Sequence, residues 1–248
     1  MEGTLILHGG DAFTPKNKQL HYDWLRLIRG EHRPRVSIVP LAELRKPILV
    51  AQETSRFFQS VATFPEYVEI TDQLSANTAA NYGGLDKTDA IVLTDGSPVY
   101  FVEQIHGTHT EKSLQNMLNR QGALFGVGAT AMVTGAVYWL DGGWEPGLAL
   151  APHLAIMPRY DSMRMRFTPE RLLADLPDGV TLIGIEENTA LVCHPEGYYS
   201  VLGHGTVTIV RGPDDEREHR SGHKFALDAP ADPDDSADES SEPDADAE

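Results

Sequence analysis

The sequence predicts an α/β fold, a doubly wound and mostly parallel sheet with helices on both faces, and three observations lead to this prediction. Short apolar runs typical of buried strands alternate with segments whose apolar residues recur at helical spacing. Strand–helix–strand units of this kind favour right-handed crossovers and parallel strands. In the last third of the chain, short strand-like runs separated by turns replace this alternation.

The first part of the chain supplies the alternating elements. The apolar run TLILH stops at Gly9-Gly10, as a strand followed by a turn does, and apolar residues then recur at helical spacing around Trp24. Further along, Pro98 directly after the N-cap residue Ser97 is a strong helix start. The expected strands are 4–8, 35–40, 67–70, 90–94 and 123–127, and the expected helices are 20–28, 48–61, 99–105, 111–119 and 129–138.

The last part contains four short apolar runs that are expected to extend the sheet or to form a small β layer at its edge. These runs are 180–185, 190–193, 198–202 and 206–210. Hydrophobic periodicity stops after Val210. We therefore expect an α/β domain over 1–211, a charged linker over 212–225 and a disordered acidic tail over 226–248. The tail is rich in Asp, Glu, Ser, Ala and Pro and buries too little apolar surface to offset chain entropy.

Charge and hydropathy disfavour several classes of function. The 248 residues carry a formal net charge of −17, and ten acidic residues without any Lys or Arg fall in 228–248. The remaining body has 20 basic and 27 acidic residues, so binding to nucleic acid phosphates is disfavoured. No run approaches the roughly 18 apolar residues of a membrane span, and no signal peptide is recognisable. A cytoplasmic location without membrane contact is therefore expected.

The cysteine and histidine content argues against a metal site. Cys193, the single cysteine, excludes an internal disulfide framework, and its apolar strand predicts a buried, inert thiol. The ten histidines include no H-E-x-x-H motif and no compact cluster with Asp or Glu. No metal and no cofactor are therefore expected.

Three segments should meet where ligands bind in doubly wound folds, at the carboxyl ends of the strands. They are the turn 9–11, the segment 95–98 and the segment 126–129. The third is typical of a nucleophile elbow, a strained strand-to-helix turn that exposes a hydroxyl and leaves backbone N–H groups free for an oxyanion. Here the elbow position is Gly128. Glycine tolerates a turn that costs other residues roughly 1–3 kcal/mol, but it has no side chain with which to attack.

The sequence resembles the cyanophycinase and dipeptidase E group of serine peptidases, which has a class I glutamine amidotransferase-like fold. The family elbow G-T-S-A-G-A-M-V-x-G lies without gaps on 126–135 (GVGATAMVTG) and puts the nucleophilic serine on Gly128. Residues 89–97 (DAIVLTDGS) resemble a family strand ending in G-G-N or G-G-D, whose backbone helps to build the oxyanion hole. Residues 184–192 (GIEENTALV) and 203–207 (GHGTV) resemble G-I-D-E-x-T-A-L-V and G-x-G-x-V.

The resemblance also implies that the catalytic base is lost. The family histidine lies in a segment like G-L-G-L-L-P-G-V-V-V-D-Q-H-F, which aligns with 147–160 (GLALAPHLAIMPRY) and falls on Arg159. Arginine has too high a pKa to accept a proton at neutral pH. We therefore expect a non-catalytic relative that retains a pocket for a small anionic or peptide ligand.

The expected binding residues surround the elbow. Arg159 beside oxyanion-type N–H donors would suit a carboxylate or phosphate, whereas a salt bridge to a nearby acid is the alternative. The acidic pair Glu186 and Glu187 is expected to hydrogen-bond loops. The candidate ligand-binding residues are Gly96, Ser97, Gly128, Ala129 and Arg159.

Two other functions stay open. In the first, the protein is an active hydrolase whose nucleophile has moved to Ser97 or Thr130, although a helix N-cap and a first-turn helix residue are the simpler interpretations. His153 or His8 would then replace the lost base, although structural roles are simpler for both. In the second, the acidic tail recruits a basic protein partner. Either a monomer or a homodimer is consistent with the family resemblance.

Overall fold

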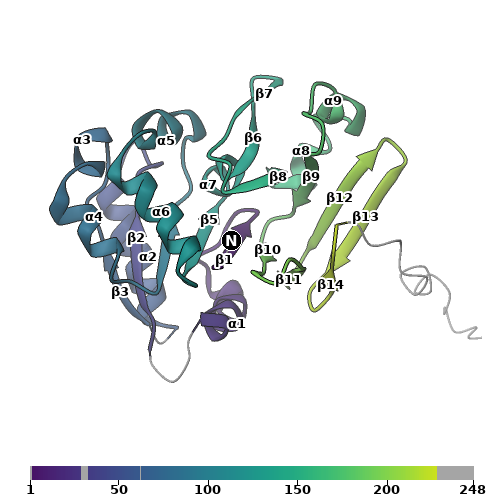
Figure 1. Cartoon of the computed structure of the whole chain (residues 1–248). Coiled ribbons are helices and arrows are strands. Elements are labelled where there is room, and N and C mark those ends of the chain that lie inside the picture. The colour runs from purple at the N-terminus through teal and green to yellow at the C-terminus, as the bar shows by residue number, and fades with distance from the viewer. Residues whose placement is uncertain (1, 29–32, 62, 228–248) are drawn as a thin grey trace, which may run out of the picture.

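The computed structural model describes residues 2–28, 33–61 and 63–227 of the chain. The expected acidic tail, 226–248, lies outside the described residues except for its first two. Two sheets with flanking helices make up the described part (Figure 1). Within that part, no helix combines the length and the apolar character needed to cross a membrane.

The first sheet has eight strands in the order β14-β11-β10-β1-β5-β4-β2-β3. Strands β1, β5, β4, β2 and β3 run parallel, whereas β10, β11 and β14 continue the sheet in antiparallel pairing. The parallel doubly wound sheet expected from the sequence is thus confirmed. Its strands are β1 (Thr4–His8), β2 (Arg35–Val39), β3 (Phe64–Tyr67), β4 (Ala90–Leu93), β5 (Ala123–Val127), β10 (Thr189–Cys193), β11 (Tyr199–Gly203) and β14 (Lys224–Phe225).

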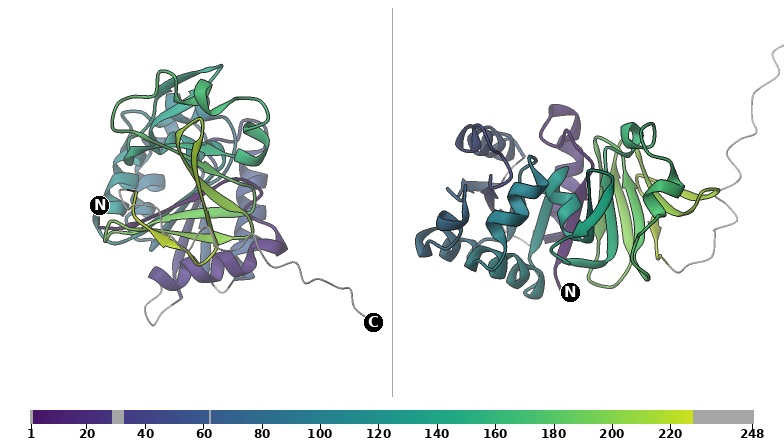
Figure 2. Two further views of the ribbon diagram at one scale, coloured as in Figure 1. Left: turned by 90° about the vertical axis from the view of Figure 1, so that its right-hand side faces the viewer. Right: turned by 90° about the horizontal axis from the view of Figure 1, so that it is seen from above.

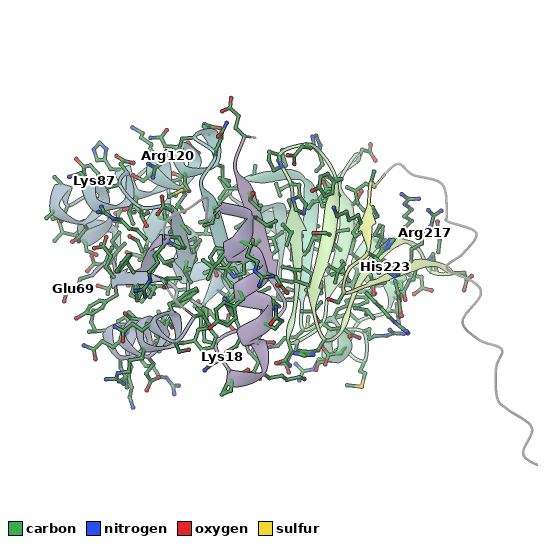
Figure 3. The ribbon with its side chains drawn as sticks, turned by 90° about the horizontal axis from the view of Figure 1, so that it is seen from below. Lys18, Glu69, Lys87, Arg120, Arg217 and His223 are labelled. Carbon is green, nitrogen blue, oxygen red and sulfur yellow. The ribbon has the colours of Figure 1, made fainter. Side chains whose placement is uncertain are left out.

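Helices cover both faces of this sheet because its strands are buried on both sides. Ile6 and Phe125 face one apolar cluster with α1 and α2, and Leu5 and Leu124 face the other with α5 and α6. Figure 3 shows α1 crossing the face that is seen from below, with Lys18 labelled at its start. The helices are η1 (Pro15–Asn17), α1 (Lys18–Ile28), α2 (Pro47–Gln59), α3 (Gln73–Ala76), α4 (Ala79–Leu85), α5 (Pro98–Ile105) and α6 (His109–Asn119).

A second, six-stranded sheet has the order β13-β12-β9-β8-β6-β7 and stands beside the first (Figure 2). The short helices α7, α8 and α9 accompany it. Of the four late runs, β10 and β11 extend the first sheet as expected, whereas β9 and β12 belong to this second sheet. The elements are α7 (Ala129–Val133), β6 (Gly135–Leu140), β7 (Gly143–Pro146), β8 (Ala151–Pro158), α8 (Tyr160–Met163), α9 (Pro169–Leu173), β9 (Thr181–Ile185), β12 (Thr206–Gly212) and β13 (Asp215–Arg220).

The helix predicted over 129–138 is wrong beyond Val133. From Gly135 the chain forms β6, which pairs with β7 and β8. A Cβ atom at Gly135 would lie 2.6 Å from the Leu154 carbonyl oxygen, so glycine permits this close approach to β8. The aromatic pair Tyr138 and Trp139 then lies on a pleated strand, where such residues pack well.

The charged linker predicted over 212–225 is also wrong, because this segment forms β13 and β14. Alternate side chains of β13 find partners on the neighbouring elements. Glu216 accepts a hydrogen bond from the Tyr160 hydroxyl at 2.7 Å, and Phe225 of β14 stacks on Tyr199 at 5.6 Å between ring centroids. In Figure 3, Arg217 and His223 mark this side of the molecule, opposite Lys87 and Glu69. Contacts made by tertiary structure therefore stabilise strands that lack apolar periodicity.

Candidate functional site

The elbow predicted at the end of β5 is present. Gly128 has φ 54° and ψ −113°, a left-handed φ that favours glycine, and it is the N-cap residue of α7. Its N–H donates to the His8 carbonyl at 2.9 Å, and its carbonyl accepts from Met132 at 3.0 Å. The backbone of a nucleophile turn is therefore retained without a nucleophilic side chain.

The carboxylate of Asp95 occupies the space beside Gly128. A Cβ atom built on Gly128 would lie 2.4 Å from Asp95 Oδ1 and 2.5 Å from Oδ2, closer than atoms can approach. Asp95 follows β4, the strand next to β5. Its Oδ1 accepts hydrogen bonds from the backbone N–H groups of Ala129 and Gly96, each at 2.8 Å. Two N–H groups that the sequence assigns to an oxyanion-binding site are thus taken by an aspartate of the same chain.

Arg159 completes this corner from the second sheet. It follows β8 with φ 51° and ψ 44°, and its N–H donates to the Gly9 carbonyl at 3.0 Å. Its Nη2 lies 2.6 Å from Asp95 Oδ2, and its Nε lies 3.2 Å from Glu187 Oε1. The alternative expectation for Arg159, a salt bridge to a nearby acid, is therefore confirmed. We call the three side chains of Asp95, Arg159 and Glu187 the ion cluster.

The protonation of Arg159 follows from these contacts. Desolvation opposes its charge, but hydrogen bonding and the negative charge of Asp95, followed by those of Glu187, outweigh it. The pKa of the guanidinium is therefore raised above its ordinary value. A group that stays protonated at every physiological pH cannot serve as a general base.

The turn after β1 lies against the ion cluster, and its two glycines leave no room for a side chain. A Cβ atom on Gly9 would lie 2.1 Å from the Glu186 carbonyl oxygen, and one on Gly10 would lie 3.1 Å from Arg159 Nε. On the other side of the cluster, a Cβ atom on Gly96 would lie 2.1 Å from the Ala42 carbonyl oxygen. Close backbone approach therefore fixes the loops that carry the donors.

The two acidic residues at the end of β9 have separate partners. Glu186 Oε2 accepts a hydrogen bond from the Thr206 N–H at 2.8 Å and so holds the start of β12. Glu187 instead contacts Arg159 in the ion cluster. Both carboxylates contact loops or loop-end residues, as the sequence predicts.

The two hydroxyls considered as relocated nucleophiles are engaged elsewhere. Ser97 Oγ accepts from the Tyr100 N–H at 3.3 Å as the N-cap of α5. Thr130 is fully buried, and its Oγ1 accepts from the Val127 N–H at 2.9 Å while the Leu93 carbonyl lies 3.0 Å away as an acceptor. Among the described residues, neither hydroxyl hydrogen-bonds a histidine.

The histidines considered as replacement bases are also unsuited to that role. His8 is fully buried, and its Nδ1 accepts from the Gly10 N–H at 3.1 Å. Burial first, and then the charges of His21 and Arg159, lower the pKa of His8 to about 3. His153 is exposed in β8, six residues from Arg159 and thus about 20 Å away along an extended strand.

The remaining candidates for chemistry are the Cys193 thiol and a metal site. Cys193 is buried, and burial raises the pKa of its thiol to about 12, so the thiol is protonated at neutral pH. No group of three or more His, Cys, Asp and Glu side chains in 2–28, 33–61 and 63–227 is arranged to hold a metal ion.

Asp95 is the site residue that the sequence reasoning missed. The segment Asp95-Gly96-Ser97 resembles G-G-N or G-G-D, and the first glycine of that motif falls on Asp95. A carboxylate in place of a glycine was therefore visible in the sequence. Its partners were not, because they depend on the positions of β4, β5 and β8 in two sheets.

Comparisons with known proteins agree with this architecture. The model of "Peptidase family S51" matches residues 5–200. Cyanophycinase of Trichormus variabilis is 25% identical over 194 residues, which cover 73% of this chain and 64% of that relative, so the chain spans less than two thirds of its length. Cyanophycinase of Geminocystis herdmanii is 28% identical over 189 residues, covering 71% of this chain and 69% of the relative.

Two solved structures share the fold. A peptidase from an acI-B1 actinobacterium superposes with a TM-score of 0.80 at 20% identity, covering 92% of this chain and 98% of that one. A putative peptidase E protein from Listeria monocytogenes gives a TM-score of 0.57 at 14% identity, covering 88% and 98%. Because the family model matches well over half of the chain, this protein belongs to peptidase family S51.

Proposed function

We propose that this chain is a non-catalytic member of peptidase family S51 that binds a small anionic or peptide ligand. One observation carries the proposal. The position beside the elbow where a nucleophile would stand is filled by the Asp95 carboxylate, which also occupies the N–H donors of Gly96 and Ala129. Serine peptidase chemistry requires a nucleophile, a base and free oxyanion donors. The proposal is supported because Gly128 has no nucleophilic atom, the protonated Arg159 is no base, and Asp95 takes the two N–H donors.

The sizes of the expected rate losses favour a complete loss of peptidase activity over weak activity. Removing the nucleophile or the base of a serine peptidase lowers kcat roughly a millionfold. A residual enhancement of about 10³–10⁴ over water then comes from substrate binding and the oxyanion hole. Here the Asp95 carboxylate competes for the N–H donors that would supply the second contribution. We therefore expect no measurable turnover.

The remaining chemistry of the corner supports binding. The guanidinium of Arg159 and two backbone N–H groups converge on one anionic group, the arrangement by which proteins hold carboxylates. The names of the relatives, cyanophycinase and peptidase, make peptides the first class of ligand to test.

The test is an activity assay on the full chain with aspartyl dipeptides, a β-aspartyl-arginine polymer and a fluorophosphonate probe. An active cyanophycinase serves as the positive control. We expect turnover equal to the buffer rate and no covalent labelling. Turnover that Ser97→Ala or Thr130→Ala abolishes, in a variant that stays folded by circular dichroism, would show that the nucleophile has moved and would refute the proposal.

A restoration experiment sharpens the same test. Gly128→Ser with Arg159→His returns the nucleophile and the base but leaves Asp95 crowding the new side chain. We expect labelling by the fluorophosphonate to increase when Asp95→Gly is added to these two changes. Equal labelling with and without the third change would show that Asp95 does not block the corner.

A further inference from the structure

We propose that the corner formed by Gly96, Ala129 and Arg159 is a carboxylate-binding site that carries its own occupant, Asp95, so that an external carboxylate enters only by exchange with Asp95. This inference rests on the proposed function and adds the class of ligand and the way in which the site is regulated. It starts from the fact that the donors point at one carboxylate from three separate loops.

The donors match a carboxylate in both shape and charge. Two N–H groups share Oδ1 of Asp95 at 2.8 Å each, and Arg159 Nη2 takes Oδ2 at 2.6 Å. A planar guanidinium beside N–H donors suits the two oxygens of a planar carboxylate. Glu187 contacts Nε of the same guanidinium, so a phosphate with nearly two negative charges would meet more repulsion than a single carboxylate.

The occupant can leave without disturbing the fold. The side chains of Asp95 and Arg159 are 31% and 40% exposed, so solvent and solutes reach the pair. Hydrogen bonds from two N–H groups and one guanidinium hold Asp95 in the site, so the open arrangement is the minor one. Rotation of the Asp95 side chain would free the three donors while the backbone hydrogen bonds of the elbow stay in place.

Because Asp95 is part of the chain, it lowers the affinity of the site for every ligand that has to displace it. A ligand that binds only when Asp95 has moved away has an affinity reduced by the small fraction of molecules in which the site is open. A free carboxylate therefore binds weakly to the natural chain. A ligand that displaces Asp95 must add contacts beyond its carboxylate, as an acidic peptide does.

The experiment measures binding of sodium acetate to the full chain, with sodium chloride at equal ionic strength as the reference. We expect Asp95→Ala to bind acetate at least tenfold more tightly than the natural chain, and to prefer acetate over inorganic phosphate. Adding Arg159→Gln should return the affinity to the level of the natural chain. Asp178→Ala, which removes an exposed carboxylate in the loop before β9, is the control with the same change of charge and should behave like the natural chain.

Three results would overturn the inference: no gain in a folded Asp95→Ala chain, an equal gain in Asp178→Ala, or a gain that survives Arg159→Gln. If Asp95→Ala does not fold, Asp95→Asn keeps an oxygen for the N–H donors but loses the charge that holds Arg159. It should then show a smaller gain, and no gain would count against the inference. Peptidase turnover by the natural chain would refute the proposed function but would leave this binding result standing, so the two failures are distinguishable.

Discussion

The turn at Gly9-Gly10 lies between two regions in which ionisable side chains differ in their exposure to solvent. On one side lies the ion cluster, whose three side chains are between 31% and 42% exposed and contact one another. On the other side lie His8 and His21, which are fully buried. Gly10 adjoins both regions. Its N–H donates to His8 Nδ1, and a Cβ atom at this position would crowd Arg159. A buried histidine next to a candidate site is therefore a poor proton acceptor, because burial opposes the charge that it would acquire.

Burial is the main reason why the two histidines stay neutral, and a hydrogen bond accepted by Nδ1 of each ring acts in the same direction. His21 Nδ1 accepts from Trp24 Nε1 at 3.0 Å, so the ring proton must sit on Nε2, which faces the Ala12 carbonyl at 3.0 Å. Protonation of Nδ1 would place two donors face to face. Burial is the main cause that lowers the pKa of His21 to about 4, although the hydrogen bond to Ala12 opposes it. The aromatic rings of Phe57 and Phe125, 4.8 and 5.1 Å away between centroids, leave little water to solvate a charge.

The largest expected effect is the loss of stability in acid. The unfolded chain takes up protons on both histidines near pH 6.5, whereas the folded chain does so only near pH 3 and pH 4. Their contribution to stability is therefore complete above pH 6.5 and is lost as the pH falls. Each histidine should lower the free energy of unfolding by about 1.4 kcal/mol per pH unit below pH 6.5. Urea denaturation between pH 7.5 and pH 5 measures this slope.

Two variants separate the buried histidines from other titrating groups. His8→Asn keeps an acceptor for the Gly10 N–H without a titrating ring, so the pH slope should fall by about one proton. His153→Asn, at an exposed position, should leave the slope unchanged. Equal slopes in all three chains would mean that His8 is protonated in the folded state.

A side chain at the elbow should have an intermediate effect. Gly128→Ser places a residue at φ 54° and forces Asp95 away, which we expect to cost about 2–3 kcal/mol. Gly83→Ala is the matched control, because nothing lies within 4 Å of its Cβ position in α4, and it should stabilise the chain by about 0.5–1 kcal/mol. Adding Asp95→Gly should recover part of the loss in Gly128→Ser. Additive losses in the double variant would contradict the crowding seen here.

The smallest expected effect concerns the ion cluster itself. Arg159→Gln removes both ion pairs, yet we expect a loss of less than about 1 kcal/mol, because the three side chains are partly exposed. Salt should reduce the difference further. Arg26→Gln, which breaks a single exposed pair with Asp23, is the reference. A loss above about 2 kcal/mol in low salt would mean that the cluster holds the two sheets together.

Local patterns in the sequence predicted the parts of the site that depend on neighbouring residues. The segment 126–135 predicted the turn at Gly128 and the start of α7, and the apolar runs predicted the two-faced burial of β1 and β5. The resemblance of 147–160 to the family segment also placed Arg159 among the expected site residues. Such features need only a short stretch of chain, which is why they were visible.

The parts that the sequence did not predict depend on distant residues. Asp95 reaches Arg159 across 64 residues of chain, and Tyr160 reaches Glu216 of β13 across 56. The segment past Val133 has a helical pattern but forms a strand, because Gly135 lies against Leu154 of β8. Periodicity carries no information on which strands become neighbours, so these contacts appear only in three dimensions.

The overlap between the Asp95 carboxylate and the Cβ position of residue 128 also limits how this sequence can change. Glycine at position 95 goes with serine at 128 in the motifs that these segments resemble, and here aspartate goes with glycine. Serine and aspartate together would collide. A serine at position 128 is therefore compatible with this corner only when the Asp95 side chain turns away or is replaced, so the residues at 95 and 128 constrain each other.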